Sequence, residues 1–202
     1  MAGSPTIRSV RLPPADLATR AWPRTRQVSR AWYRVHPKMN AATHFSLTPT
    51  HRYSHPLCPH PILYVAMDPE TCLWERFGDD AFDNGYTLPQ TQWDDTMIST
   101  IDVPNLYLCD LSKTTTRSAI TVDLTALMND DLAVPQQWGL EIQKHPAQVP
   151  AIKFKSRFTG TACLAVFDRG GIRAQLKETP LGPLSQFNPA LDWLTRNNVT
   201  LL

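Results

Sequence analysis

The segment 61–78 constrains the fold most strongly, because its sequence predicts a buried strand that leads directly into a helix. Residues 62–67 form an apolar run that is too short for a helix and rich in strand-forming side chains. Asp68 is a typical N-cap residue, and Pro69 suits the first helical position because its missing N–H needs no partner there. Gly78 predicts the end of the helix.

Tyr64 lies in the middle of this expected strand, and Glu75 lies in the second half of the expected helix. Taken alone, a strand tyrosine belongs partly to the core and a helix glutamate belongs to the solvated surface. An assignment of either residue to chemistry therefore depends on the rest of the chain.

The length of 202 residues suits one domain with a sizeable core. The apolar content of 42% and the charged content of 19% are ordinary for a globular protein. The sequence has no apolar run of membrane-spanning length and does not begin with a secretory signal. Four cysteines without CxxC spacing suit buried thiols in a reducing compartment. We expect a cytoplasmic protein that does not contact a membrane.

Positive charge is concentrated at the N-terminus. Residues 1–30 carry one acidic residue, Asp16, and six arginines, which gives +5: Arg8, Arg11, Arg20, Arg24, Arg26 and Arg30. The formal net charge is +2, so the remaining residues sum to −3. We therefore expect a basic extension over residues 1–29 and a domain over residues 30–202. The extension could contact a nucleic acid or an acidic partner, whereas the domain does not have the composition of a general nucleic-acid binder.

Residues 30–36 alternate and contain aromatic side chains, as a strand does, and Pro37 ends the pattern. Arg34 is flanked there by large apolar side chains. A buried guanidinium requires an anion or several acceptors. Either a structural ion pair or a ligand phosphate would satisfy it.

Residues 40–60 are expected to form a polar loop that contains most of the histidines. His51, His55, Cys58 and His60 could in principle bind zinc, but their spacing matches no common zinc motif. A solvated loop is the favoured interpretation.

Several further elements are expected along the chain. The expected strands are 97–103, 106–111, 151–157, 161–167 and 199–202, with a further candidate at 173–177. The expected helices are 15–22, 123–128, 136–145 and 188–196, the last capped by Asn188 and Pro189. Residues 79–96 are expected to form a loop. In the strand 151–157, Ser156 shares the face of the apolar residues. It is either a small space-filling residue or a hydroxyl directed into a cleft.

Several short motifs, taken in order, resemble the RES domain over about residues 30–170. They are Trp32-Tyr33-Arg34-Val35-His36, Arg52, Leu63-Tyr64-Val65-Ala66-Met67-Asp68, Glu75, Ile152-Lys153-Phe154-Lys155-Ser156-Arg157 and Cys163-Leu164-Ala165-Val166-Phe167-Asp168-Arg169. The family is named for an Arg, a Glu and a Ser, which fall here at Arg34, Glu75 and Ser156.

The resemblance implies a single α+β domain with an ADP-ribosyltransferase-like fold, a central cleft, and NAD as substrate. It implies that Arg34 and Arg52 bind the NAD phosphates, Tyr64 lies near the nicotinamide, Glu75 is the catalytic carboxylate and Ser156 positions the dinucleotide. It also implies a toxin that is paired with an Xre-type helix-turn-helix antitoxin. No metal is expected.

The chemistry of these residue types agrees with that assignment. Cleavage of the nicotinamide–ribose bond passes through an oxocarbenium-like state, which a nearby carboxylate stabilises. Two arginines suit a pyrophosphate, and a tyrosine stacks on a flat heterocycle. The chain lacks a glycine-rich phosphate loop, which disfavours a Rossmann-type oxidoreductase. Water, inorganic phosphate and a protein side chain all stay open as the acceptor. The alternatives are a non-catalytic module that binds zinc through the 51–60 segment, or one that binds nucleic acid through residues 1–30.

Overall fold

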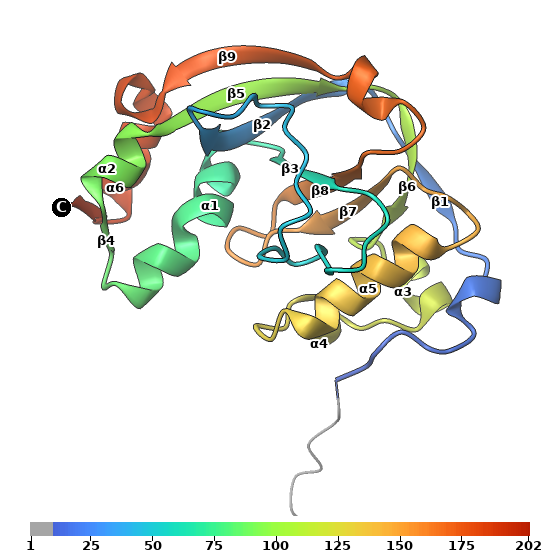
Figure 1. The fold of residues 1–202 in the computed structure, drawn as a ribbon. Helices are drawn as coiled ribbons and strands as arrows, with labels where there is room; N and C mark the ends of the chain where they lie inside the picture. The colour runs from blue at the N-terminus through green and yellow to red at the C-terminus, as the bar shows by residue number, and fades with distance from the viewer. Residues whose placement is uncertain (1–9) are drawn as a thin grey trace, which may run out of the picture.

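The computed structural model describes residues 10–202, which form a mixed eight-stranded sheet with helices (Figure 1). The strand order is β1-β6-β7-β8-β3-β2-β5-β9. The strands are β1 (Arg24–Gln27), β2 (Arg30–Pro37), β3 (Ile62–Ala66), β5 (Thr96–Val103), β6 (Leu106–Asp110), β7 (Ala151–Lys155), β8 (Ala162–Phe167) and β9 (Lys177–Pro183). Neighbouring strands run antiparallel, except that β6 and β7 are parallel. The predicted α+β class is confirmed.

The helices and the remaining strands complete the chain. The α-helices are α1 (Pro69–Asp83), α2 (Gln90–Asp94), α3 (Thr114–Ile120), α4 (Leu124–Leu127), α5 (Ala133–Lys144) and α6 (Asn188–Arg196). Short 3-10 turns occupy Leu17–Thr19, Ile172–Gln175 and Leu184–Gln186. Strands β4 (Thr87–Leu88) and β10 (Thr200–Leu201) form a separate parallel pair. Among residues 10–202, no helix has both the length and the apolarity to span a membrane.

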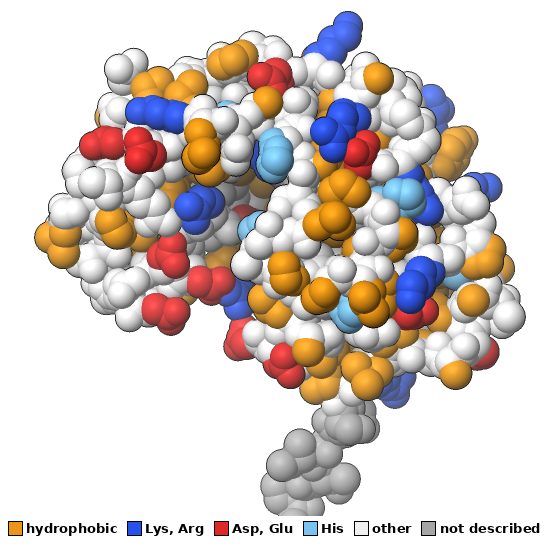
Figure 2. All heavy atoms as spheres, viewed as in Figure 1, with side chains coloured by type: hydrophobic (Ala, Val, Ile, Leu, Met, Phe, Trp, Pro, Cys, Tyr) orange, Lys and Arg blue, Asp and Glu red, His pale blue; other side chains and the backbone are white. Residues whose placement is uncertain are grey.

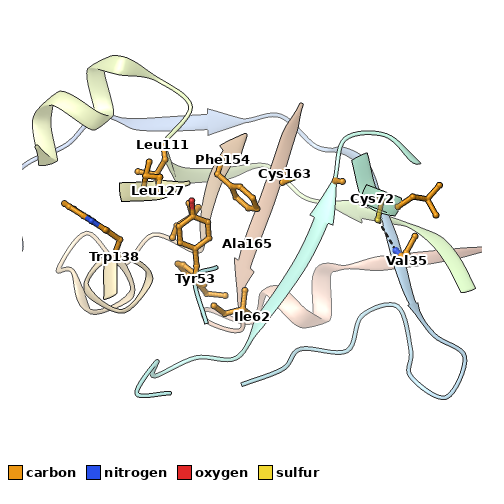
Figure 3. Packing of buried hydrophobic residues seen from close by; sticks show 14 of the residues in the cluster. Val35, Tyr53, Ile62, Cys72, Leu111, Leu127, Trp138, Phe154, Cys163 and Ala165 are labelled. Carbon is orange, nitrogen blue, oxygen red and sulfur yellow. Dashed lines mark hydrogen bonds between the residues drawn. The ribbon is translucent and has the colours of Figure 1, made fainter. Parts of the chain in front are cut away.

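Each face of the sheet carries its own core. The face toward the helices includes Cys72, Trp138 and Phe154, which Figure 3 shows among the packed side chains. The opposite face includes Leu63 and Val65 and is covered partly by the loop after β2 and by the Ile172–Gln175 turn. Burial on both faces explains why β3 reads as a continuous apolar run. Because side chains alternate along a strand, Tyr64 lies on the helical face, together with α1.

The predicted strand–helix unit is present, but the helix is longer than expected. The Asp68 carboxylate accepts a hydrogen bond from the Thr71 N–H at 2.8 Å, and Pro69 occupies the first turn, as predicted. The prediction that Gly78 ends the helix is wrong, since α1 continues to Asp83. A Cβ at position 78 would lie 2.7 Å from ring carbons of Phe158. Gly78 is therefore needed for close packing rather than for a cap.

Other predictions also need correction. The segment 79–96 is not a loop, because it contains the end of α1, β4 and α2. The candidate strand 173–177 is wrong: a 3-10 turn precedes β9, which begins at Lys177. The helix expected over 15–22 is reduced to one 3-10 turn. Helix α6 has the predicted bounds, but its N-cap is Phe187, without a side-chain cap bond.

Part of the basic N-terminal segment belongs to the sheet. Strand β1 pairs with β6, and the side chains of Leu17 and Trp22 are buried in the core on the helical face. Arg24 and Arg26 stay exposed on β1, while Arg8 lies outside the described residues. The sequence pattern missed β1 because it is short and polar.

Candidate active site

Glu75 and Ser156 form a direct hydrogen bond between α1 and the turn that follows β7. The Ser156 hydroxyl donates to the Glu75 carboxylate at 2.6 Å, across 81 positions of sequence. The same hydroxyl oxygen accepts the N–H groups of Phe158 at 3.2 Å and Thr159 at 3.4 Å. Ser156 is only 1% exposed, so this orientation is fixed by the protein. The Ser156 hydroxyl is thus directed at Glu75 and is more than a space-filling group, while its direction into a cleft stays a prediction.

Residues 156–159, here named the 156–159 turn, lie along α1. Thr159 shares a hydrogen bond of 2.8 Å with Thr71 in the first turn of the helix. Phe158 packs against Gly78, and Arg157 forms an ion pair with Asp79. The strand expected over 151–157 ends earlier, at Lys155, and the residues that follow it form these contacts.

Burial raises the pKa of the Glu75 carboxyl above its ordinary value. The Ser156 hydrogen bond and the positive charges of Arg52 and Arg157 oppose this shift, and Asp79 adds to it. The Glu75 side chain nevertheless retains access to solvent. Figure 2 shows that this side of the molecule is hollowed between the part over α1 and the part over α5, in agreement with the predicted cleft. A solvent-accessible carboxylate can meet a small substrate.

Arg52 is held by the last residue of α4 and by the chain that follows it. Its Nη1 donates to the Leu127 carbonyl at 2.7 Å and to the Asn129 carbonyl at 3.2 Å. Its charge also lowers the pKa of Glu75. The structure thus joins Glu75 and Ser156 directly, and Arg52 influences Glu75 through its charge.

Tyr64 is held through its hydroxyl group. The oxygen accepts the Tyr53 N–H at 3.1 Å and shares a hydrogen bond of 2.9 Å with the Ser54 hydroxyl. Burial raises the pKa of Tyr64, so the phenol is neutral at physiological pH. The ring of His51 lies 5.0 Å from the Tyr64 ring, centroid to centroid.

Arg34 contacts the loop after β2 instead of the Glu75–Ser156 pair. Its Nη1 donates to the carbonyls of Ala42 at 2.5 Å and His44 at 2.7 Å. Burial lowers the pKa of Arg34 to about 10, so the guanidinium stays charged at neutral pH. The several acceptors expected for a buried guanidinium are therefore backbone carbonyls. Its charge lowers the pKa of His51, whose ring lies 5.0 Å from that of Tyr64.

His51 and Arg76 were not among the predicted site residues. Burial and the charges of Arg34 and Arg76 lower the pKa of His51, so the imidazole is neutral at physiological pH. The sequence presented His51 only as a possible metal ligand. Its position beside Arg52 in the chain is the signal that could have placed it at the site.

The four residues considered as zinc ligands each contact a different partner. His55 Nδ1 accepts the Leu57 N–H at 3.0 Å, and the Cys58 thiol is directed at the Tyr53 carbonyl at 3.7 Å. His60 lies 3.0 Å from an Arg169 nitrogen. In the part of the chain that the structure describes, no three His, Cys, Asp or Glu side chains gather as a metal site would require. The zinc-binding alternative therefore has no support in the geometry.

Comparison with known proteins agrees with this arrangement. A family model described as the RES domain matches residues 13–187. The chain belongs to the RES domain family. The match includes β1, and the three residues for which the family is named lie on β2, on α1 and in the 156–159 turn.

A solved structure shares the fold of this RES domain. A chain of the crystal structure of the M. tuberculosis MbcT–MbcA toxin–antitoxin complex superposes with a TM-score of 0.62 and 18% sequence identity. The match covers 90% of this chain and 98% of that one. The shared fold agrees with the expected α+β class, and the likeness to ADP-ribosyltransferases stays an implication of the family resemblance. A comparison with curated protein sequences gives no match.

Proposed function

We propose that this RES domain cleaves the nicotinamide–ribose bond of NAD, with Glu75 as the catalytic carboxylate. The observation that carries the proposal is the 2.6 Å hydrogen bond from Ser156, which orients the solvent-accessible Glu75 carboxylate, whose charged form Arg52 also favours. Bond cleavage leaves positive charge on the ribose, and an oriented carboxylate stabilises that charge. The leaving nicotinamide is neutral, so no strong general acid is required.

Arg34 and Arg52 have the donor capacity that a pyrophosphate needs. A guanidinium carries five N–H donors. In both residues, the hydrogen bonds formed within residues 10–202 use Nη1 alone. Nε and Nη2 are therefore left to bind phosphate oxygens in a bidentate manner. Backbone carbonyls fix each side chain before the substrate arrives.

Tyr64 and His51 would supply the contact with the nicotinamide ring. The hydroxyl of Tyr64 is already engaged by Tyr53 and Ser54, so the ring is held in place. A neutral imidazole beside it adds no charge that would repel the cationic pyridinium. Stacking on flat side chains of this kind stabilises a heterocycle.

A cellular role as the toxin of a toxin–antitoxin pair follows from the same proposal. The solved structure that shares the fold belongs to a toxin–antitoxin complex. An enzyme that consumes NAD in its own cytoplasm requires restraint, which we assign to an Xre-type antitoxin protein. The acceptor of the ADP-ribosyl group is water, inorganic phosphate or a protein side chain.

Nicotinamide release from NAD by the purified chain tests the proposal. The assay compares the wild type with Glu75→Gln, which keeps the shape and removes the charge, in the presence and absence of inorganic phosphate. Glu70→Gln is the matched control, since Glu70 lies in the first turn of the same helix and pairs on the surface with Arg196. We expect Glu75→Gln to lose at least about a hundredfold in kcat and Glu70→Gln to keep wild-type activity. Equal turnover by wild type and Glu75→Gln would overturn the proposal.

A further inference from the structure

Arg157 lies where two parts of the site meet. Its guanidinium pairs with Asp79 on α1 and, at 2.6 Å, with Asp130 in the connection between α4 and α5. It also lies over the Phe158 ring, 4.7 Å from the centroid. The Arg157 side chain is 24% exposed, whereas those of Asp79 and Asp130 are 69% and 89% exposed. Arg157 is thus the ordered centre of this group of charges.

Each carboxylate that Arg157 holds is adjacent to a residue of the site. Asp79 follows Glu75 by one turn of α1. Asp130 directly follows Asn129, whose carbonyl accepts a hydrogen bond from Arg52. Arg157 itself directly follows Ser156. One side chain therefore joins the helix of Glu75 to the segment that holds Arg52.

We propose that Arg157 is a positioning residue, which keeps Glu75 and Arg52 at the correct separation by joining α1 to the Asn129–Asp130 segment. This inference rests on the proposed NAD cleavage for its functional meaning, but its structural part can be tested without substrate. Arg157 touches neither reacting atoms nor, in this assignment, the substrate.

The same geometry gives Arg157 an electrostatic role. Its charge lowers the pKa of Glu75, while Asp79 raises it. Loss of Arg157 would remove the first effect and leave the Asp79 charge unneutralised. The other groups that face or influence Glu75 are Arg52, Ser156, Cys72, Cys163 and Tyr53. Burial raises the pKa values of Cys72, Cys163 and Tyr53, so these groups are neutral at neutral pH and do not compensate for a lost Arg157 charge.

The first experiment measures the pKa of Glu75 directly, by NMR titration of glutamate labelled with carbon-13 at the side-chain carboxyl. The Glu75 signal is identified by its absence in Glu75→Gln. We expect Arg157→Gln to raise the pKa of Glu75, and the double variant Arg157→Gln with Asp79→Asn to return it toward the wild-type value. Arg173→Gln is the control, since Arg173 forms a comparable surface pair with Asp168. An unchanged pKa in Arg157→Gln would overturn the proposal.

The second experiment uses the kinetics of NAD cleavage to distinguish the connection of Arg157 to Asp79 from its connection to Asp130. Arg157→Gln should lower kcat by about tenfold to a hundredfold through misplacement of Glu75, and should move the acidic limb of the pH profile to higher pH. Asp130→Asn releases only the segment that holds Arg52, so it should raise KM for NAD and leave that limb in place. Arg157→Lys should restore part of kcat.

Thermal unfolding shows whether each variant is folded. Loss of stability without a change in the pH profile would indicate a purely structural ion pair and would contradict the positioning role. Absence of NAD cleavage by the wild type would refute the proposed function, whereas the NMR titration would still decide the role of Arg157.

Discussion

The ionisation of Glu75 is set by single side chains that come from three parts of the chain. Ser156 donates a hydrogen bond, Arg52 and Arg157 contribute positive charge, and Asp79 contributes negative charge. Burial by the surrounding protein raises the pKa of Glu75 more than these favourable partners lower it, so the pKa stays above its ordinary value of 4.5. A raised pKa makes the carboxylate a better proton acceptor than an ordinary glutamate.

Glu75→Gln should stabilise the fold at neutral and alkaline pH. The raised pKa means that the folded state favours the protonated carboxyl, so wild-type stability falls as the pH rises through that pKa. A glutamine has no charge and avoids this loss. Urea unfolding should therefore give a higher free energy of unfolding for the variant at pH ~8, and a smaller difference at pH ~4. A wild type more stable than Glu75→Gln at pH ~8 would contradict the raised pKa.

Ser156→Ala should lower activity and change its pH dependence. The variant removes the donor that stabilises the charged form of Glu75, so the pKa of Glu75 should rise further and the acidic limb of the NAD-cleavage profile should move to higher pH. A hydrogen bond to a charged group contributes about 1.5–3 kcal/mol, which corresponds to a loss in kcat of about tenfold to a hundredfold. Ser185→Ala, at an exposed position, is the control. An unshifted profile would argue against the assigned role of Ser156.

At the scale of elements, close packing between α5 and the loop after β2 fixes the segment that carries Arg52. Gly139 on α5 faces the backbone of Tyr53, and a Cβ there would lie 2.4 Å from the Tyr53 carbonyl oxygen. Tyr53 in turn donates its N–H to the Tyr64 hydroxyl. A larger residue at position 139 would therefore displace the loop that connects Arg52 with Tyr64.

Gly139→Ala should destabilise the protein and weaken NAD binding together. The added methyl group meets backbone, which cannot rotate away, so we expect a loss of about 1–3 kcal/mol in the free energy of unfolding. KM for NAD should rise because Arg52 and Tyr64 shift. Gln137→Ala, two positions earlier on the same helix and only half-buried, is the control for helix substitution. Wild-type stability in Gly139→Ala would show that the loop is free to move.

The elements that the sequence predicted are those with a strong local signal. The apolar runs of β3 and β8 and the Asp68-Pro69 start of α1 each specify their structure within a few residues. The missed elements depend on distant contacts. Gly78 lies inside α1, where the Phe158 ring packs closely on it, and β9 is an edge strand whose prolines obscure its pattern.

The same distinction applies to the site. Glu75 and Ser156 could be named from the family motifs, and the structure joins them. His51 could have been suspected from its position beside Arg52, but its contact with the Tyr64 ring could not. The double pairing of Arg157 could not be predicted, because its partners lie on elements far apart in sequence. Arg34 was expected to require acceptors, but nothing in its local sequence indicated that loop carbonyls would supply them.

At the scale of the whole molecule, the helix that carries Glu75 rests against α6. Trp193 on α6 is fully buried, 5.1 Å from the ring of Trp74 and 6.4 Å from that of Phe77, both on α1. The family match ends at residue 187, before α6 begins. The packing nevertheless makes α6 part of the support of the site.

Trp193→Ala should cost about 3–5 kcal/mol in the free energy of unfolding, because it leaves a large cavity behind α1. NAD cleavage should fall as α1 loses its support. Leu191→Ala, at a position on the same helix that is 38% exposed, should cost less than about 1 kcal/mol. Denaturant unfolding measures both values. A small loss for Trp193→Ala would show that α6 is dispensable for the fold.

The long sequence separation of the partners in the site has a consequence for the time at which activity begins during synthesis. Glu75 meets its donor 81 positions later, and Arg52 meets its first acceptor 75 positions later. A growing chain on the ribosome thus presents Arg52 and Glu75 long before Ser156 has been made. Until then the carboxylate has no oriented donor, and the arginine has no acceptor until Leu127 and Asn129 have been made. The proposed consumption of NAD would therefore start only once nearly the whole domain has been translated, when the folded surface that a restraining partner must recognise is also complete.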